Sequence, residues 1–199
     1  MVLRKNLKKK FALISVFEKK NLKYLCSNLN KFNYSFISSG STGNKIRELG
    51  FKCKDISKLT NFKEMFGGRV KTLNPYIYSS LLYIRDDKMH KKQFQLLKMP
   101  EIDIVVVNLY PFKKYLKKNN NDQIIEMIDI GGPSLLRAAG KNHRYITPIV
   151  DIMDYKKLLK NLSKNNGATD ISFRKKMAYK VFKQTAQYDK LISNWLNEK

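Results

Sequence analysis

Apolar residues in this chain form several short continuous runs that predict strands. Residues 10–16 form one such run, which is typical of a strand covered on both faces. Residues 102–108 form the strongest run because they are rich in β-branched side chains. Shorter runs at residues 35–38 and 144–150 predict two further strands.

Helix-compatible segments alternate with these predicted strands. They cover residues 19–31, 44–49, 133–140 and 174–196, and Asp151 is expected to cap a helix that begins near Tyr155. The alternation implies βαβ units and therefore an α/β fold, doubly wound, with a mainly parallel sheet and helices on both faces. Ligands of such sheets bind at the carboxyl ends of the strands.

Length and composition restrict the class of protein. A chain of 199 residues with 43% hydrophobic residues can build one core, so we expect residues 1–199 to form a single domain. The apolar runs are far shorter than the roughly 20 residues of a membrane span, and no signal peptide is recognisable. We therefore expect a cytoplasmic protein without a membrane partner. Two cysteines and two histidines form no pattern typical of a metal or redox site.

The formal net charge of +24 allows three explanations. Clustered cations could bind nucleic acid through its phosphates, could attract a small anionic substrate, or could be lysines accumulated on a solvated surface. The lysines are spread along the chain, mostly in pairs, and form no dense arm. This spread favours the surface explanation, and we do not expect nucleic acid as a partner.

A turn of small and hydroxyl residues follows the second predicted strand. Its sequence is Ser39-Gly40-Ser41-Thr42, and it leads into a predicted helix. The backbone N–H groups at a helix N-terminus suit a phosphate or carboxylate, although such a turn can equally be a simple helix cap. Ser15 and Lys19 follow the first strand and could complete the anion site, or could belong to an ordinary connection.

Three further segments carry chemically useful side chains. In Gly67-Gly68-Arg69-Val70-Lys71-Thr72, the two cations point the same way if the segment is extended. Tyr110 follows the strongest strand, and Asp129 precedes a Gly-Gly-Pro sequence that can begin a helix. Tyr110 could instead be a packing residue and Asp129 a loop cap.

The order of these motifs resembles one family. The chain contains Ser39 to Thr42, Gly68 to Leu73, Asn108-Leu109-Tyr110-Pro111-Phe112, Ile128 to Gly132, Arg137 to His143, and Thr185-Ala186-Gln187-Tyr188-Asp189. Together they resemble the inosine monophosphate (IMP) cyclohydrolase domain. This domain is the N-terminal half of the bifunctional purine-biosynthesis enzyme AICAR formyltransferase/IMP cyclohydrolase. The similarity extends over about residues 10–196.

The resemblance implies a methylglyoxal-synthase-like fold and a hydrolase that acts on cyclic amidines. The implied reaction closes 5-formamidoimidazole-4-carboxamide ribonucleotide to IMP with loss of water, in the last step of de novo purine biosynthesis. It implies no cofactor or metal, and a homodimer. The formyltransferase domain of the family is absent from this chain, so formyl transfer is not expected. A non-catalytic nucleotide-binding regulatory domain of the same fold is the alternative.

The resemblance also implies the site residues. The catalytic group would be Lys71, Tyr110, Asp129 and Lys141. In our hypothesis, Lys141 pairs with Asp129 for proton transfer, while Lys71 and Tyr110 polarise the reacting oxygen. The phosphate would lie against Ser15, Lys19, Ser39, Gly40, Ser41 and Thr42, and the base and ribose against Arg69, Thr72, Asn108 and Gly131.

Five positions depart from the usual family pattern, one of which is Gln184, in place of a histidine near the C-terminal helix. Phe17 replaces a small hydroxylated residue, and Ser41 replaces a glycine in the phosphate turn. Asn74 and Tyr78 replace histidines after the lysine motif.

Overall fold

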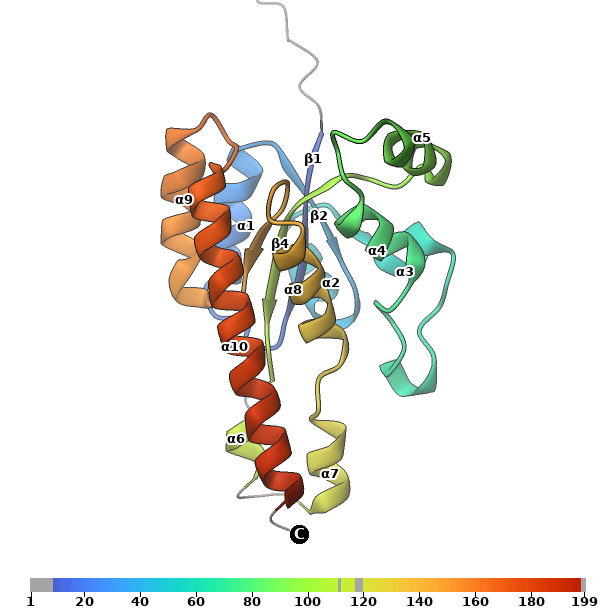
Figure 1. Ribbon diagram of the computed structural model, residues 1–199, viewed down its shortest axis with the longest axis vertical. Coiled ribbons are helices and arrows are strands. Elements are labelled where there is room, and N and C mark those ends of the chain that lie inside the picture. The colour runs from blue at the N-terminus through green and yellow to red at the C-terminus, as the bar shows by residue number, and fades with distance from the viewer. Residues whose placement is uncertain (1–8, 111, 117–119, 198–199) are drawn as a thin grey trace, which may run out of the picture.

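Five parallel strands form the centre of the fold, in a computed structural model that describes residues 9–110, 112–116 and 120–197 (Figure 1). Their order across the sheet is β3-β2-β1-β4-β5, and every neighbouring pair is parallel. The strands are β1 (Lys10–Val16), β2 (Tyr34–Ser38), β3 (Cys53–Asp55), β4 (Ile102–Asn108) and β5 (Thr147–Ile149). The predicted parallel α/β sheet is thus confirmed. The basic segment 1–8 and Pro111 of the tyrosine motif lie outside the described residues.

Ten α-helices are found in the described part of the chain. They are α1 (Leu22–Lys31), α2 (Gly40–Glu48), α3 (Ile56–Thr60), α4 (Pro75–Leu82), α5 (Lys88–Leu97), α6 (Phe112–Tyr115), α7 (Asn121–Glu126), α8 (Gly131–Lys141), α9 (Tyr155–Lys164) and α10 (Ile171–Asn197). Two short 3-10 helices, η1 (Phe66–Gly68) and η2 (Ile152–Asp154), complete the list. No helix among the described residues is long and apolar enough to cross a membrane.

Apolar side chains cover both faces of the sheet, which explains the continuous apolar runs. Alternate residues of a strand point to opposite faces. In β1, Leu13 contributes to a core beneath α4 and α8, while Ile14 contributes to a second core beneath α1 and α9. Both residues are fully buried. The predicted doubly wound arrangement follows from these two cores.

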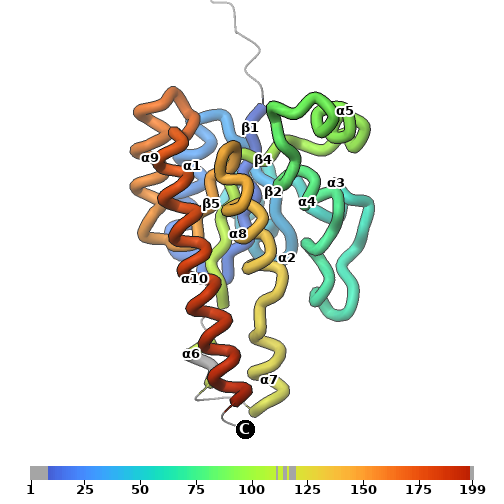
Figure 2. Tube along the Cα trace, viewed as in Figure 1, coloured from blue at the N-terminus to red at the C-terminus, as the bar shows by residue number. Residues whose placement is uncertain are grey.

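A third, smaller cluster lies beyond the carboxyl ends of the strands. The long helix α10 crosses the whole molecule, and its last turns approach α6 and α7 below the sheet (Figure 2). Phe112, Ile124, Tyr188 and Trp195 are buried there. This cluster fixes the C-terminal half of α10 beside the segments that follow β4.

Several predicted boundaries need correction. The helix expected at residues 44–49 begins at Gly40, so the hydroxyl-rich turn is itself the first turn of α2. The strand expected at residues 144–150 is limited to Thr147–Ile149, and Asp151 caps the short helix η2, where its side chain accepts a hydrogen bond from the N–H of Met153. Patterning alone did not predict β3 or the helices α3 to α7. Most of these elements are short, and the longer helix α5 buries only Phe94.

Candidate functional site

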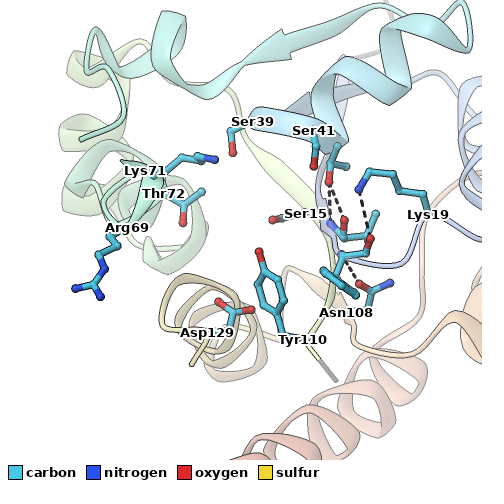
Figure 3. A pocket seen from close by; sticks show the side chains of 14 residues that line it. Ser15, Lys19, Ser39, Ser41, Arg69, Lys71, Thr72, Asn108, Tyr110 and Asp129 are labelled. Carbon is cyan, nitrogen blue, oxygen red and sulfur yellow. Dashed lines mark hydrogen bonds between the residues drawn. The ribbon is translucent and has the colours of Figure 1, made fainter. Parts of the chain in front are cut away.

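A polar cavity of about 310 Å³ lies at the carboxyl ends of β1, β2 and β4 (Figure 3). Eleven of the fourteen predicted site residues line it: Ser15, Lys19, Ser39, Ser41, Thr42, Arg69, Lys71, Thr72, Asn108, Tyr110 and Asp129. The three exceptions are Gly40, Gly131 and Lys141. This position is the one at which parallel α/β sheets bind ligands.

One end of the cavity is suited to an anion. The hydroxyls of Ser15, Ser39 and Ser41 point into it, and Lys19 approaches from the side of β1 (Figure 3). The first turn of α2 begins at the same place, with N–H groups that have no partner within the helix and the positive end of the helix dipole. Hydroxyls, a cation and a helix N-terminus together suit an anion such as a phosphate.

Two predicted ligands of the substrate are instead used to build the cavity wall. The hydroxyl of Thr42 donates to the carbonyl of Val16 (2.9 Å) and accepts from its N–H (3.2 Å), which ties α2 to the end of β1. The side-chain oxygen of Asn108 accepts from the N–H groups of Phe17 and Glu18 at 2.6 and 3.1 Å. Both side chains therefore shape the loop after β1 rather than offering free polar groups.

Lys71 lies across the cavity from Lys19 (Figure 3). Its ammonium is 3.1 Å from the carboxylate of Glu64, an ion pair that pattern reasoning did not identify. A Cβ on Gly40 would lie 2.8 Å from Nζ of Lys71. Gly40 therefore does not line the cavity as predicted but leaves the space that the lysine occupies.

Tyr110 directs its hydroxyl toward the centre of the cavity (Figure 3). Its ring packs against the ring of Phe17, with centroids 4.7 Å apart and an interplanar angle of 49°. The residue that departs from the family pattern is thus the aromatic neighbour of the candidate catalytic phenol. The other side of this phenol faces the cavity.

The carboxyl group of Asp129 lies beside Tyr110 (Figure 3). Its Oδ1 accepts a hydrogen bond from the N–H of Gly132 at 2.8 Å. Burial raises the pKa of this carboxyl group above its ordinary value, and the bond from Gly132 offsets only part of that effect. A carboxylate with a raised pKa is a better proton acceptor than an exposed one.

Arg69 does not point the same way as Lys71, as it would in an extended segment. Its backbone is helical rather than extended, so the two side chains diverge, and the guanidinium pairs with Glu126 away from the cavity centre (Figure 3). Gly131 leaves room for the side chain of Thr72, since a Cβ at Gly131 would lie 2.8 Å from Oγ1 of Thr72. Thr72 itself lines the cavity.

Lys141 is separated from the cavity by the length of α8. Gly131 begins this helix and Lys141 ends it, which places their backbones about 15 Å apart at 1.5 Å per residue. In Figure 1, α8 runs antiparallel to the strands, so its last residue lies toward the amino-terminal ends of the strands, opposite the cavity. The predicted pair of Lys141 with Asp129 is therefore not formed within one chain.

The remaining departures from the family pattern lie outside the cavity. The side chain of Asn74 caps α4 by accepting a hydrogen bond from the N–H of Tyr76 at 3.0 Å. Tyr78 packs against the core beneath α4 and α8. Among the described residues, no group of three or more histidine, cysteine or acidic side chains could hold a metal ion.

Comparisons with known proteins agree with this geometry. The family description "MGS-like domain" matches residues 21–134, and "AICARFT/IMPCHase bienzyme" matches residues 139–199. The bifunctional purine biosynthesis proteins PurH of Persephonella marina and Lactobacillus acidophilus are 44% and 46% identical over 94% and 95% of this chain. The chain spans only 36% and 37% of the length of these relatives.

A solved structure gives the same result for the fold. The crystal structure of ForH superposes with a TM-score of 0.81 and 28% identity, covering 93% of this chain and 97% of that one. Because the match to the MGS-like domain extends over more than half of the chain, the chain belongs to the MGS-like domain family.

Proposed function

We propose that this chain is an IMP cyclohydrolase. One observation carries the proposal: a single cavity has an anion site at one end and Lys71, Tyr110 and Asp129 at the other. A purine nucleotide precursor has its groups in the matching arrangement, with a phosphate at one end and a reacting amide at the other. The names of the PurH relatives support a role in purine biosynthesis.

The phosphate would occupy the anion site. The hydroxyls of Ser15, Ser39 and Ser41 and the N–H groups of the first turn of α2 would donate hydrogen bonds to its oxygens. Lys19 would supply a compensating positive charge. The imidazole and its substituents would then extend toward Thr72 and Asp129.

Ring closure requires a base and an oxyanion site. The carboxamide nitrogen attacks the formyl carbon, its proton moves to the carboxylate of Asp129, and the formyl oxygen becomes an alkoxide. Lys71 and Tyr110 would stabilise that oxygen by hydrogen bonds. The oxygen is then protonated and leaves as water, while the former formamide nitrogen loses its proton and forms the new C=N bond, so that IMP remains with one hydrogen on the former carboxamide nitrogen.

Lys141 can join this chemistry only from a second copy of the chain. The family resemblance places it in the catalytic group, whereas α8 keeps its backbone about 15 Å from that of Gly131, at the other end of the helix. We therefore propose a homodimer in which Lys141 of one copy serves the site of the other. Lys141 is exposed and available for such a contact.

The decisive experiment is an assay for conversion of the formamido ribonucleotide to IMP. Wild-type protein should form IMP, and Lys71→Ala should lose most of the turnover while its circular dichroism remains unchanged. A folded wild-type protein that binds the nucleotide in calorimetry without forming IMP would contradict the enzyme and would favour a regulatory domain. A metal chelator in the same assay should have no effect on the rate.

A further inference from the structure

A tyrosine on the long C-terminal helix holds the backbone of the candidate base. The hydroxyl of Tyr188 accepts a hydrogen bond from the backbone N–H of Asp129 at 2.8 Å. The same hydroxyl donates to the carbonyl of Met127 at 3.2 Å. One side-chain oxygen thus bridges both ends of the segment that carries Asp129.

The carboxyl group of Asp129 is restrained from its other side by Gly132. The N–H of Gly132 donates to Oδ1, and a Cβ at Gly132 would lie only 2.3 Å from Oδ2. With the backbone bound to Tyr188 and the carboxylate against Gly132, little freedom remains for the Asp129 side chain. We propose that Tyr188 is a positioning residue that fixes Asp129 for proton transfer, a role that rests on the proposed cyclohydrolase function.

The surroundings of Tyr188 make this hydroxyl a rigid anchor. Tyr188 is 6% exposed, and its ring packs against Phe112 with centroids 6.1 Å apart, inside the small cluster below the sheet. The phenol cannot swing away from residues 127–129 without disturbing that cluster. Burial also raises the pKa of Tyr188, so the hydroxyl stays protonated and can keep donating to Met127.

Tyr188 lies in a different family match from the start of the segment that carries Asp129. The match to the MGS-like domain ends at residue 134, before α10 begins, whereas the match to the AICARFT/IMPCHase bienzyme covers residues 139–199. The anchor for Asp129 therefore comes from the segment that the bienzyme match covers. An MGS-like sheet alone would leave the Asp129 segment without this bond.

Tyr188→Phe tests the role because it removes the bridging hydroxyl and keeps the ring. Tyr34→Phe is a matched control, since Tyr34 is also buried and its hydroxyl donates to a backbone carbonyl, that of Gly167, away from the cavity. The first readout is the pKa of Asp129 from ¹³C-aspartate NMR, assigned with Asp129→Asn. The second is the kinetics of IMP formation.

In Tyr188→Phe, we expect the pKa of Asp129 to fall toward its ordinary value, because a loosened carboxyl group gains water. We expect kcat to fall roughly 10- to 100-fold through misplacement of the base, with KM within about twofold because the phosphate site is intact. Tyr34→Phe should match wild type in both readouts.

Each result decides the inference. An unchanged pKa of Asp129 in Tyr188→Phe overturns it, as does an unchanged kcat in an enzyme that is active as wild type. If Tyr188→Phe fails to fold while Tyr34→Phe folds, the hydroxyl serves the fold as a whole and the positioning role is overturned. If wild type forms no IMP, the proposed function fails, and the NMR titration alone still decides whether Tyr188 positions Asp129.

Discussion

Phe17 and Tyr110 are aromatic neighbours at the mouth of the cavity, with ring centroids 4.7 Å apart. Phe17 is 40% exposed and Tyr110 37% exposed, so both rings are in contact with each other while remaining partly open to water. This contact restricts the phenol of Tyr110 to a direction that points into the cavity (Figure 3). The bulk of Phe17 thus supports the phenol rather than filling the anion site.

Phe17→Ser should therefore reduce turnover by releasing Tyr110. An aromatic pair contributes about 0.5–1.5 kcal/mol beyond its buried area, so we expect kcat to fall roughly two- to tenfold. Phe17→Leu, which keeps an apolar side chain beside the phenol, should lose less. Steady-state kinetics of IMP formation measures both variants.

The control for this prediction is Tyr24→Ser, which removes an aromatic ring of similar exposure from α1 without touching the cavity lining. It should keep the wild-type kcat. If Phe17→Ser is as active as Tyr24→Ser, the contact with Tyr110 has no catalytic importance.

Gly40→Ala should displace the ammonium of Lys71. The new Cβ would lie 2.8 Å from Nζ, and Gly40 has a φ of +52°, which is unfavourable for alanine. Gly50→Ala is the matched control, because Gly50 also has a positive φ, +85°, but its Cβ would meet nothing within 4 Å.

Both alanine variants should lose about 1 kcal/mol of stability from backbone strain, measured by urea unfolding. Only Gly40→Ala should also lose turnover, since only there does the methyl group compete with Lys71. Equal turnover in the two variants would show that the lysine ammonium can move without cost to the chemistry.

Much of the fold could be predicted from the apolar pattern. Residues 10–16 and 102–108 were predicted as strands with the bounds that β1 and β4 have, because strands buried on both faces show an uninterrupted apolar run. β3 has only three residues, none fully buried, and so carries no comparable pattern. The start of α2 was missed because Gly40, Ser41 and Thr42 are typical turn residues. In the structure they form the first turn of the helix.

The candidate site was predictable only in part. A motif gives the order of residues along the chain but not the direction in which their side chains point. Asp129 and Tyr110 both line the cavity. Tyr110 follows the carboxyl end of β4, and Asp129 lies between α7 and α8. Arg69 turns away because its backbone is helical, and Lys141 lies at the far end of α8. The anchors Glu64 and Tyr188 depend on tertiary contacts between segments far apart in the chain, which local patterns do not reveal.

Asp129→Asn should remove activity and increase stability at neutral pH. The raised pKa means that the folded protein favours the neutral carboxyl group, so the charged form costs stability above that pKa. Asparagine is neutral at every pH and keeps an oxygen for the N–H of Gly132. The melting temperature of the variant should exceed that of wild type at pH 7. The difference should shrink as the pH falls through the raised pKa of Asp129 and vanish below the ordinary aspartate value of about 3.9.

The pH dependence of kcat in wild type should also show the titration of Asp129. Because Asp129 must be deprotonated to act as a base, kcat should fall as the pH decreases through its raised pKa, above the ordinary aspartate value of about 3.9. Asp189→Asn, a change at an exposed carboxylate on α10, should alter neither the melting temperature nor this acid limb. A melting difference that is constant with pH would contradict the assigned titration.

Lys141 provides a test of the proposed homodimer. If each site uses Lys71 from one copy and Lys141 from the other, Lys71→Ala and Lys141→Ala should each be inactive alone. In mixed dimers, one of the two sites then combines both intact lysines, whereas the other site lacks both. Random pairing of equal amounts makes half of the dimers mixed, so co-expression should restore about a quarter of the wild-type rate.

The complementation distinguishes the positions that Lys141 could occupy. The position of Lys141 at the far end of α8 leads us to expect recovery, because no side chain there reaches the cavity of its own chain. A fully active Lys141→Ala would exclude the residue from the site altogether. Two inactive variants without recovery, in a sample shown by mass spectrometry to contain mixed dimers, would mean that Lys141 acts within its own chain. In that case α8 would have to move by more than the length of a lysine side chain, and the proposed dimer site would be wrong.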